Sequence, residues 1–323
     1  MRNLITGING FAASHLSDLL LKNDEEVFGI ARSLDNNNIS HLKGKVKVFQ
    51  SDVRDPVQFE KIIREVNPQR IYHMASVSYV PAAAKDWKSA FETNVFGTLH
   101  LFEAIKLQKV APRVMCVGSS EEYGFVDSQE MPISEKVPPN PESLYGVTKA
   151  SAEMLAQSFF FRDGLEVLRV RPFNHTGPRQ TEWFVCSSFA KQIAQIENDK
   201  ETKMVVGNLE AERDFTDVRD TVRAYYALMQ KGNPGSVYNV CSGKTVSIKE
   251  ILSTLKEFAK KEVVVIEDPE LFRKEDRPKY YGSHGLITRQ TGWVPEILLR
   301  KTLGDLLEYW REKIKSKKTD KLG

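Results

Sequence analysis

The stretch Arg2-Asn-Leu-Ile-Thr6, followed by Gly7-Ile-Asn-Gly10-Phe-Ala-Ala13, decides the fold of this 323-residue chain. Residues 2–6 read as a short strand, and apolar residues recur at helical spacing from Ser14 to Lys22. Strand, glycine turn and helix in this order are the setting of a dinucleotide-binding site, although glycines alone also mark ordinary turns. Gly7 permits the tight turn, and Gly10 lets the backbone approach a pyrophosphate at the helix N-terminus.

Strand-like segments alternate with helical ones as the chain continues. This alternation predicts a parallel sheet with helices on both faces, so the fold class is α/β with a Rossmann-type doubly wound parallel sheet. A chain of 323 residues is longer than one compact domain usually is, and a smaller α/β C-terminal substrate lobe is expected beside the sheet. The predicted strands are 26–31, 45–50, 70–73 and 114–118, and a long helix is predicted from about 83 to 107.

The residues at the strand ends bear on the choice of dinucleotide. An acidic residue about 20 positions beyond the glycines usually binds a free ribose 2′-hydroxyl, whereas an arginine suits a 2′-phosphate. Arg32 stands near this place and favours NADP(H). NAD(H) stays open, because Arg32 also suits an ordinary surface position. Asp52 has two interpretations of equal weight, a partner for adenine or a cap for the following turn.

Three further positions follow from the same pattern. Met74-Ala75-Ser76 offers small or flexible residues along which a cofactor can pass. His73 is a single histidine at a strand end, so a packed or hydrogen-bonded role is favoured over metal binding. Asn94 stands inside a predicted helix, where asparagine is mildly unfavourable, and a tertiary hydrogen bond is therefore predicted for it.

Charge and cysteine content exclude several classes of protein. The chain has 46 basic and 43 acidic residues, a net charge of +3, so no broad field for nucleic acid or a membrane is expected. The three cysteines lie far apart and outside any metal-binding motif, so neither disulfides nor a metal site are expected. No secretory signal stands at the N-terminus, and no apolar run approaches the ~18 residues that cross a bilayer. We expect a cytoplasmic protein.

Residues 116–149 concentrate reactive side chains after the strand at 114–118. They supply two hydroxyls, a carboxylate, a phenol and an amine, at Ser119, Ser120, Glu121, Tyr145 and Lys149. If the last two residues lie on a helix, their i,i+4 spacing places phenol and ammonium on one face. A nearby cation lowers the pKa of a tyrosine, which can then move a proton near neutral pH. The same spacing also arises by chance on amphipathic helices.

Gly7-x-x-Gly10-x-x-Ala13, Ser119 and Tyr145-x-x-x-Lys149 together resemble the extended short-chain dehydrogenase/reductase family, over about residues 1–310. The resemblance implies that Ser119 hydrogen-bonds the reacting oxygen and that Tyr145 exchanges the proton. It also implies that Lys149 binds the nicotinamide ribose and lowers the pKa of Tyr145. The expected cofactor-binding residues are Gly7, Asn9, Gly10, Phe11, Arg32, Asp52, Val53, Met74, Ala75, Ser76, Asn94, Tyr145, Lys149 and His175.

Four segments resemble one branch of that family, the GDP-6-deoxy-4-keto-mannose reductases, which are related to the GDP-mannose 4,6-dehydratases. The segments are 118–124, 173–178, 207–220 and 238–243. The resemblance implies NAD(P)H-dependent reduction of the C4 keto group of GDP-4-keto-6-deoxy-mannose to a GDP-6-deoxyhexose of the GDP-rhamnose type. The substrate-binding residues expected on this basis are Ser119, Ser120, Glu121, Asn174, Arg213, Arg273 and Asp276.

Two other functions stay open. Ser119-x-Glu121 keeps the spacing found in the dehydratases, where the glutamate removes the C5 proton. Serine at position 119 and the segment Thr176-Gly-Pro-Arg-Gln180 favour the reductase instead. Glu121 is therefore a base in a dehydratase and a positioning group in a reductase. The third function is a non-catalytic NADP sensor, which has no need for a serine, a tyrosine and a lysine together.

The expected domain organisation follows from these assignments. Residues 1–172 form the NAD(P)-binding Rossmann domain, to which a segment at about 215–242 returns. Residues 173–310 form mainly the nucleotide-sugar lobe, and residues 311–323 form a polar tail. The resemblance also implies a homodimer, joined through a four-helix contact of the helices at about 84–107 and 143–162.

Overall fold

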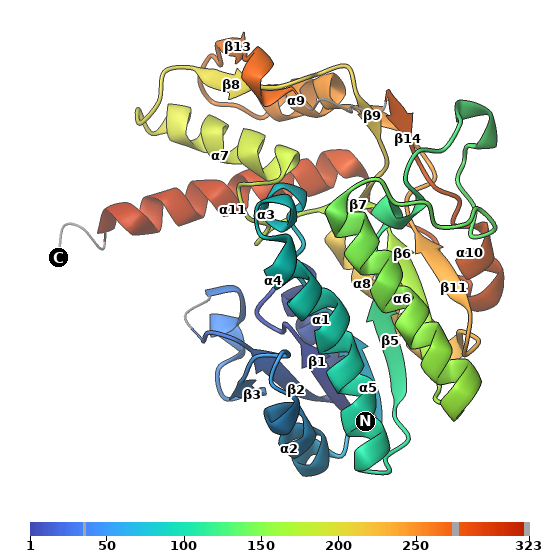
Figure 1. Ribbon diagram of the computed structural model, residues 1–323. Coiled ribbons are helices and arrows are strands. Elements are labelled where there is room, and N and C mark those ends of the chain that lie inside the picture. The colour runs from blue at the N-terminus through green and yellow to red at the C-terminus, as the bar shows by residue number, and fades with distance from the viewer. Residues whose placement is uncertain (35–36, 273–277, 320–323) are drawn as a thin grey trace.

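The computed structural model describes residues 1–34, 37–272 and 278–319. A seven-stranded parallel sheet with the strand order β3-β2-β1-β4-β5-β6-β11 forms its centre (Figure 1). The first six strands have the Rossmann order, so the predicted sheet is confirmed. The strands are β1 (Arg2–Thr6), β2 (Glu26–Ala31), β3 (Lys47–Gln50), β4 (Arg70–His73), β5 (Arg113–Val117), β6 (Val167–Pro172) and β11 (Val237–Val240).

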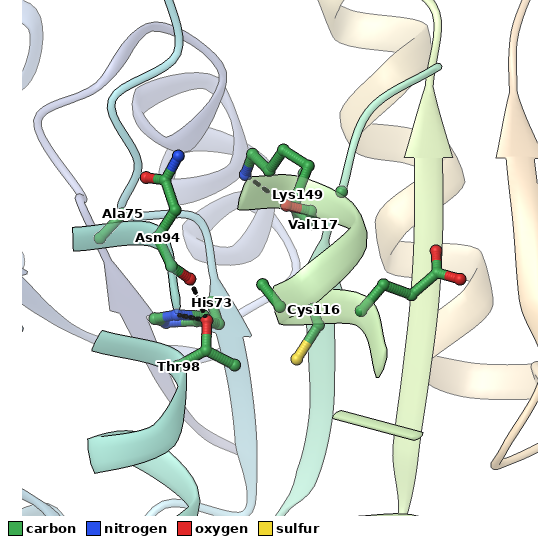
Figure 2. A pocket seen from close by; sticks show the side chains of 10 residues that line it. His73, Ala75, Asn94, Thr98, Cys116, Val117 and Lys149 are labelled. Atoms are coloured by element: carbon green, nitrogen blue, oxygen red, sulfur yellow. Dashed lines mark hydrogen bonds between the residues drawn. The ribbon is translucent and has the colours of Figure 1, made fainter. Parts of the chain in front are cut away.

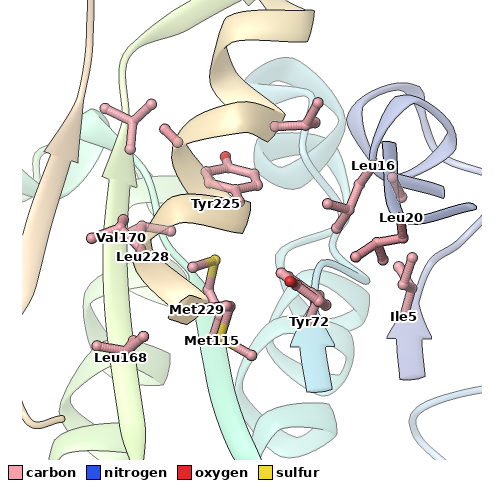
Figure 3. Close-up of a cluster of buried hydrophobic side chains, with 14 of the residues drawn as sticks. Ile5, Leu16, Leu20, Tyr72, Met115, Leu168, Val170, Tyr225, Leu228 and Met229 are labelled. Atoms are coloured by element: carbon pink, nitrogen blue, oxygen red, sulfur yellow. The ribbon is translucent and has the colours of Figure 1, made fainter. Parts of the chain in front are cut away.

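Helices α1 (Phe11–Lys22) and α8 (Val218–Lys231) cover one face of the sheet and pack against each other. Leu16, Leu20 and Leu228 are fully buried in the core between these helices and the sheet (Figure 3). Burial of each leucine stabilises the fold by roughly 2 kcal/mol. This core fixes the axis of α1, and with it the direction of the glycine turn that precedes the helix.

Three helices cover the opposite face: α2 (Pro56–Val66), α5 (Gly97–Leu107) and α6 (Leu144–Asp163). The rings of Phe102 and Phe159 stack between α5 and α6 with their centroids 4.7 Å apart. Helices on both faces confirm the predicted doubly wound architecture. The same packing holds α6 across the carboxyl end of β5.

The helix predicted from about 83 to 107 is divided in the structure. α3 (Val80–Lys85) ends at Asp86, whose carboxylate caps the next helix, α4 (Trp87–Phe91). A π-helical turn at Glu92–Phe96 then joins α4 to α5. Apolar residues recur at helical spacing across the breaks because α3, α4 and α5 each bury an apolar face against the domain, for example at Ala83, Ala90 and Leu101. The spacing of apolar residues therefore could not reveal the interruption.

A second core lies beyond the carboxyl ends of the large sheet. Three helices enclose it, α7 (Val185–Glu197), α9 (Ile248–Glu257) and α11 (Leu299–Thr319), and α10 (Gly285–Thr291) packs on α8 and β11 (Figure 1). Seven short strands form small sheets beside these helices. They are β7 (Asn174–Thr176) with β10 (Phe215–Asp217), β8 (Met204–Val206) with β13 (Val265–Glu267), and β9 (Glu212–Arg213) with β12 (Val246–Ser247) and β14 (Lys279–Tyr280).

The prediction of a polar tail from residue 311 is wrong. α11 continues through this region to Thr319, and Trp310 and Ile314 are buried in the second core. Arg311 is only 5 % exposed and donates to both carboxylate oxygens of Glu197, at 2.5 and 2.7 Å. The basic residues between Arg311 and Lys321 concealed the apolar residues at helical spacing among them.

Two properties of the described residues limit the kinds of site that the fold carries. In residues 1–34, 37–272 and 278–319, no helix has the length and apolar composition to span a membrane. The same ranges contain no group of three or more histidine, cysteine, aspartate or glutamate side chains arranged to hold a metal ion.

Candidate active site

The glycine turn between β1 and α1 has the geometry that a cofactor phosphate requires. Gly7 has a positive φ of 70°, and a Cβ atom at this position would lie 2.9 Å from the Cα of Ala75. Gly10 is the N-cap of α1 and has no side chain over the first turn, so the backbone N–H groups at the start of the helix are accessible to an anion. The hydroxyl of Ser76 is buried without a hydrogen-bond partner among the described residues. These features fit a dinucleotide.

The turn is tied to the neighbouring strand ends by hydrogen bonds. The Thr6 hydroxyl accepts from the backbone N–H groups of Met74 and Ala75, both at 3.0 Å. His73 is buried, with Nδ1 2.9 Å from the Thr6 hydroxyl and Nε2 3.1 Å from that of Thr98. Burial lowers the pKa of His73 to about 3, so the ring is neutral. The predicted hydrogen-bonded role of His73 is confirmed.

The predicted adenosine side of the site brings together the ends of β2 and β3. Asn9 donates to the carbonyl of Ser33 (2.7 Å), which fixes the glycine turn to the chain beyond β2. Arg32 is exposed at the end of β2. The Asp52 carboxylate accepts from the backbone and the guanidinium of Arg54, which lowers the pKa of Asp52. The turn-capping interpretation of Asp52 is therefore confirmed, and contact with adenine stays a prediction.

His175 joins the cofactor turn to the second lobe. Its ring stacks on Phe11 at the start of α1, with centroids 5.8 Å apart and planes at 8°. Its Nδ1 lies 3.1 Å from the carbonyl oxygen of Phe173, and burial lowers the pKa of the ring. A neutral, oriented imidazole therefore faces the predicted nicotinamide side of the turn. Contact of His175 with a nicotinamide stays a prediction.

Ser119 is held by a capping box. Its hydroxyl accepts from the backbone N–H of Glu121 (3.2 Å), and its own N–H donates to the Glu122 carboxyl group (2.7 Å). Ser119 is 9 % exposed, and Glu122 is fully buried. Our sequence analysis did not identify Glu122. The pattern Ser119-x-x-Glu122 is the sequence signature of a capping box and could have revealed it.

Tyr145 and Lys149 lie on the first two turns of α6, which begins at the cap residue Ser143. They are 8 % and 6 % exposed, and the Lys149 Nζ lies 6.0 Å from the centroid of the Tyr145 ring. Lys149 donates to the carbonyl oxygen of Val117 at 2.7 Å, as Figure 2 shows. Helical i,i+4 placement on one face is confirmed.

The predicted lowering of the Tyr145 pKa is wrong for this structure. Burial raises the pKa of Tyr145 above its ordinary value, and a hydrogen bond with the Ser119 side chain only partly opposes this. Burial also lowers the pKa of Lys149 to about 8, so Lys149 is still mainly protonated at neutral pH. Desolvation of the phenolate by burial is the largest cause of the raised Tyr145 pKa. The Tyr145 hydroxyl therefore keeps its proton at neutral pH.

Asn94 positions α6 from the π-helical turn. Its amide donates to the Thr148 hydroxyl (2.9 Å) and its carbonyl accepts from the backbone of Val77 (2.9 Å), which confirms the predicted tertiary hydrogen bond. Thr148 in turn donates to the carbonyl of Tyr145 at 2.8 Å. Asn94, His73 and Lys149 line a cavity of about 10 Å³ (Figure 2).

Two predicted substrate residues of the second lobe, Asn174 and Arg213, lie beside Asp214. This buried carboxylate accepts from the backbone N–H groups of Ser242, Gly243 and Gly282 and from the Ser242 hydroxyl, and burial raises its pKa to about 6. Asn174 donates to the Asp214 carbonyl (3.2 Å), and Arg213 is the adjacent residue.

The remaining predicted substrate residues fall into two groups. Ser120 is buried, and its carbonyl accepts from the Tyr280 hydroxyl (2.8 Å), whereas Glu121 is half-buried beside it. Arg273 and Asp276, the predicted ribose and phosphate partners, lie outside the described residues.

Comparison with known proteins agrees with this geometry. A family model described as GDP-mannose 4,6 dehydratase matches residues 4–306. GDP-6-deoxy-D-mannose reductase of Pseudomonas aeruginosa is 35 % identical over 97 % of this chain and 98 % of its own. GDP-mannose 4,6-dehydratase of Vibrio cholerae is 28 % identical over 94 % of this chain and 92 % of its own.

Solved structures show the same architecture. The structure of RMD from Pseudomonas aeruginosa complexed with NADPH has a TM-score of 0.84 and 31 % identity, covering 97 % of this chain and 100 % of its own. UDP-glucose 4-epimerase of Thermotoga maritima with UDP-glucose has a TM-score of 0.87 and 26 % identity, covering 97 % and 100 %.

Proposed function

Because the chain belongs to the GDP-mannose 4,6 dehydratase family, we propose that it reduces the C4 keto group of GDP-4-keto-6-deoxy-mannose with NADPH. The observation that carries the proposal is the state of Tyr145. A reductase needs a protonated tyrosine next to the carbonyl oxygen, and the burial of Tyr145, which raises its pKa, favours this form. The similarity to a GDP-6-deoxy-D-mannose reductase over 97 % of the chain supports the same direction of reaction.

The groups that would hold the cofactor lie at the carboxyl edge of the large sheet. The turn from Gly7 to Gly10 suits the diphosphate, Arg32 suits a ribose 2′-phosphate, and Lys149 suits the nicotinamide ribose. NADPH supplies the hydride when it is bound. NAD(H) is the alternative cofactor, and Arg32 argues against it.

The chain's own residues handle the proton. Tyr145 donates the proton of its hydroxyl to the oxygen at C4, and Ser119 donates a hydrogen bond to that oxygen as negative charge develops there. Lys149 stabilises the phenolate that remains, which takes a proton from solvent before the next turnover. Glu121 positions the sugar beside Ser119, and Arg213 neutralises the diphosphate of the nucleotide sugar.

A dehydratase is the second candidate, favoured by the spacing of Ser119 and Glu121 and by the Vibrio cholerae relative. Two reactions distinguish the candidates. The protein is mixed with GDP-mannose alone, and separately with GDP-4-keto-6-deoxy-mannose and NADPH. We expect no product in the first reaction and NADPH oxidation in the second. A 4-keto product from GDP-mannose alone would establish the dehydratase.

A homodimer through the outer faces of α4, α5 and α6 is part of the proposal. Large apolar side chains are exposed on α5, on α6 and on the π-helical turn between α4 and α5, at Phe96 (51 %), Leu107 (64 %), Met154 (57 %) and Phe161 (72 %). α5 and α6 also pack side by side, so two copies can form a four-helix contact. We expect Phe161→Glu with Met154→Glu to convert a dimer to a monomer in sedimentation analysis. A wild-type monomer would refute the dimer.

The proposal also covers domain organisation and location. Residues 1–172, with the return at about 215–242, bind the cofactor, and residues 173–310 mainly bind the nucleotide sugar. The three cysteines are free and buried, which suits the reducing cytoplasm. Limited proteolysis with and without GDP tests the division, because GDP is expected to protect only sites in the sugar-binding lobe.

A further inference from the structure

Four charged side chains are buried together behind Ser119 and Lys149. Glu122 lies on the short turn after Ser119, Glu153 lies one helical turn after Lys149 on α6, and Arg169 and Arg171 lie on β6. Their exposures are 0 %, 6 %, 7 % and 3 % in that order. Buried charges are costly unless they are paired, so the partner of each group decides its protonation state.

The hydrogen bonds separate the two acids. The Glu153 carboxylate accepts from Arg171 Nη2 (2.5 Å), Arg171 Nε (2.8 Å) and Arg169 Nη1 (3.3 Å). The Glu122 Oε2 accepts no hydrogen bond among the described residues and lies 3.4 Å from Arg171 Nε, and a hydrogen bond joins the Glu122 and Glu153 carboxyl groups. Both guanidinium groups therefore donate to Glu153.

Glu122 is consequently the acid that holds a proton. Burial raises its pKa well above the ordinary range, and the neighbouring Glu153 raises it further, whereas Arg171 and the Ser119 N–H oppose the shift. A protonated carboxyl group still accepts through one oxygen, and the Glu122 Oε1 accepts from the Ser119 N–H at 2.7 Å. Glu122 thus binds the backbone of Ser119 without adding a negative charge.

The chain makes room for this contact. A Cβ atom at Gly118, the residue after β5, would lie 2.1 Å from the Glu122 Oε1 and 3.0 Å from the Val170 carbonyl oxygen, so a side chain there would displace the Glu122 carboxyl group. The Tyr123 ring covers Arg171 at 4.6 Å and shields the cluster from solvent. The Glu122 side chain is therefore fully enclosed, and its hydrogen bond fixes the backbone of Ser119.

We propose that Glu122 is a positioning residue for the reduction, which fixes the Ser119 hydroxyl toward the reacting oxygen while it stays neutral. Neutrality matters because negative charge develops on that oxygen, and a second buried negative charge nearby would oppose it. The proposal rests on the proposed reductase function. It assigns to Glu122 a role through Ser119 and no contact with the substrate.

Two substitutions test this role in the full-length protein. Glu122→Gln has the shape of the neutral acid and keeps an oxygen for the Ser119 N–H, so kcat is expected within about twofold of the wild type. Its pH profile of kcat is expected to coincide with that of the wild type between about pH 5 and pH 8. Glu122→Leu removes the acceptor, and kcat is expected to fall by about 30-fold.

The readouts separate positioning from folding. In Glu122→Leu, the KM for the sugar and the Kd of NADPH are expected within about twofold of wild type. The deuterium isotope effect on kcat is expected to rise, because hydride transfer becomes slower. The matched control is Glu25→Leu, which removes another buried carboxylate, paired with Arg70 at 3.2 Å. It is expected to lower thermal stability and leave kcat unchanged.

Three results would overturn the proposal. One is an unchanged kcat in Glu122→Leu, and another is a change of kcat above tenfold in Glu122→Gln. The third is a wild-type titration between pH 5 and pH 8 that Glu122→Gln abolishes. If Glu122→Leu does not fold, the Glu122→Gln measurements decide. Absence of turnover by the wild type would instead refute the proposed function.

Discussion

The two sides of the proposed crevice are built in different ways. On the cofactor side, the functional groups stand at the ends of adjacent strands of one sheet, where Thr6, His73 and Val117 follow each other across β1, β4 and β5. On the sugar side, β9 pairs with β12 and β14, three two-residue strands from distant parts of the chain. One buried carboxylate, Asp214, ties these segments together.

Because of this difference, substitutions on the two sides should have different effects on stability and binding. The sheet is stabilised by large apolar cores on both faces, so a substitution at its edge alters a single contact. The sugar side depends on a few polar contacts, so the loss of one of them disturbs several segments at once. We therefore expect separable effects on chemistry or NADPH binding from the first side, and joint effects on stability and sugar binding from the second.

The largest effect is expected for Tyr145→Phe. It removes the proton donor and leaves the sheet unchanged, so kcat should fall by about 1,000-fold while the Kd of NADPH stays within about threefold. Steady-state kinetics and fluorescence titration measure the two quantities. Tyr72→Phe, which removes another buried hydroxyl, is the matched control and should keep full kcat. Retained activity in Tyr145→Phe would refute the mechanism.

Asp214→Ala should give the next largest effect, and it tests the sugar side. Four hydrogen bonds to the carboxylate are lost, so the free energy of unfolding should fall by roughly 3 kcal/mol and the KM for the sugar should rise. Chemical denaturation and kinetics measure both. Glu210→Ala, at a side chain 80 % exposed in the same lobe, should change neither. A normal KM in Asp214→Ala would contradict the difference between the two sides.

Gly7→Ala should weaken cofactor binding in addition to lowering stability. The new methyl group would lie 2.9 Å from the Cα of Ala75, so the turn must open and the Kd of NADPH should rise by about 30-fold. Gly44→Ala is a matched control, because Gly44 has a similar φ of 81° with no atom within 4 Å of the new methyl group. It should lower stability by about 1 kcal/mol and leave the Kd unchanged. Equal effects of the two substitutions would refute the role of the turn.

The pH dependence should be smaller and should report Lys149. The pKa of this ammonium is about 8, so the charged form predominates below that pH and disappears as the pH rises through it. Since the cation is needed, kcat/KM for NADPH should fall about tenfold per pH unit above the pKa. A profile that stays flat from pH 7 to pH 10 would show that the charge of Lys149 is not required.

Arg32→Ala should give the smallest effect. An exposed charge contributes little, so the Kd of NADPH should rise only about fivefold, whereas that of NADH should not change. Isothermal titration with both cofactors measures the difference. A parallel change for NADPH and NADH would remove Arg32 from the choice of cofactor.

The sequence predicted the cofactor side well because its rules are local. The glycine turn, the alternation of strands and helices, and the one-sided placement of Tyr145 and Lys149 follow from periodicity and spacing over a few residues. The capping role of Asp52 also follows from its position at a strand end. The predicted lowering of the Tyr145 pKa was wrong because burial, which depends on the whole fold, raises this pKa.

The sugar side was less predictable because its contacts are not local. Strands of two residues leave no periodic signal, and the partners of Asp214 lie 28, 29 and 68 positions away. The sequence did not single out Glu122, although its capping-box pattern is local. Its burial beside Arg171 depends on β6, an element distant in the sequence. The prediction of a polar tail was wrong because the buried residues Trp310 and Ile314 alternate with charged residues. One of these, Arg311, is itself buried and donates to Glu197.

The central claim is that hydride enters at C4 of a keto sugar while Tyr145 supplies the proton. The most direct measurement uses NADPH deuterated at the transferred position, with GDP-4-keto-6-deoxy-mannose as the substrate and NMR analysis of the product. We predict one deuterium at C4 of the hexose for each NADPH oxidised. Product formation from GDP-mannose without added NADPH, or a product without deuterium at C4, would contradict the claim.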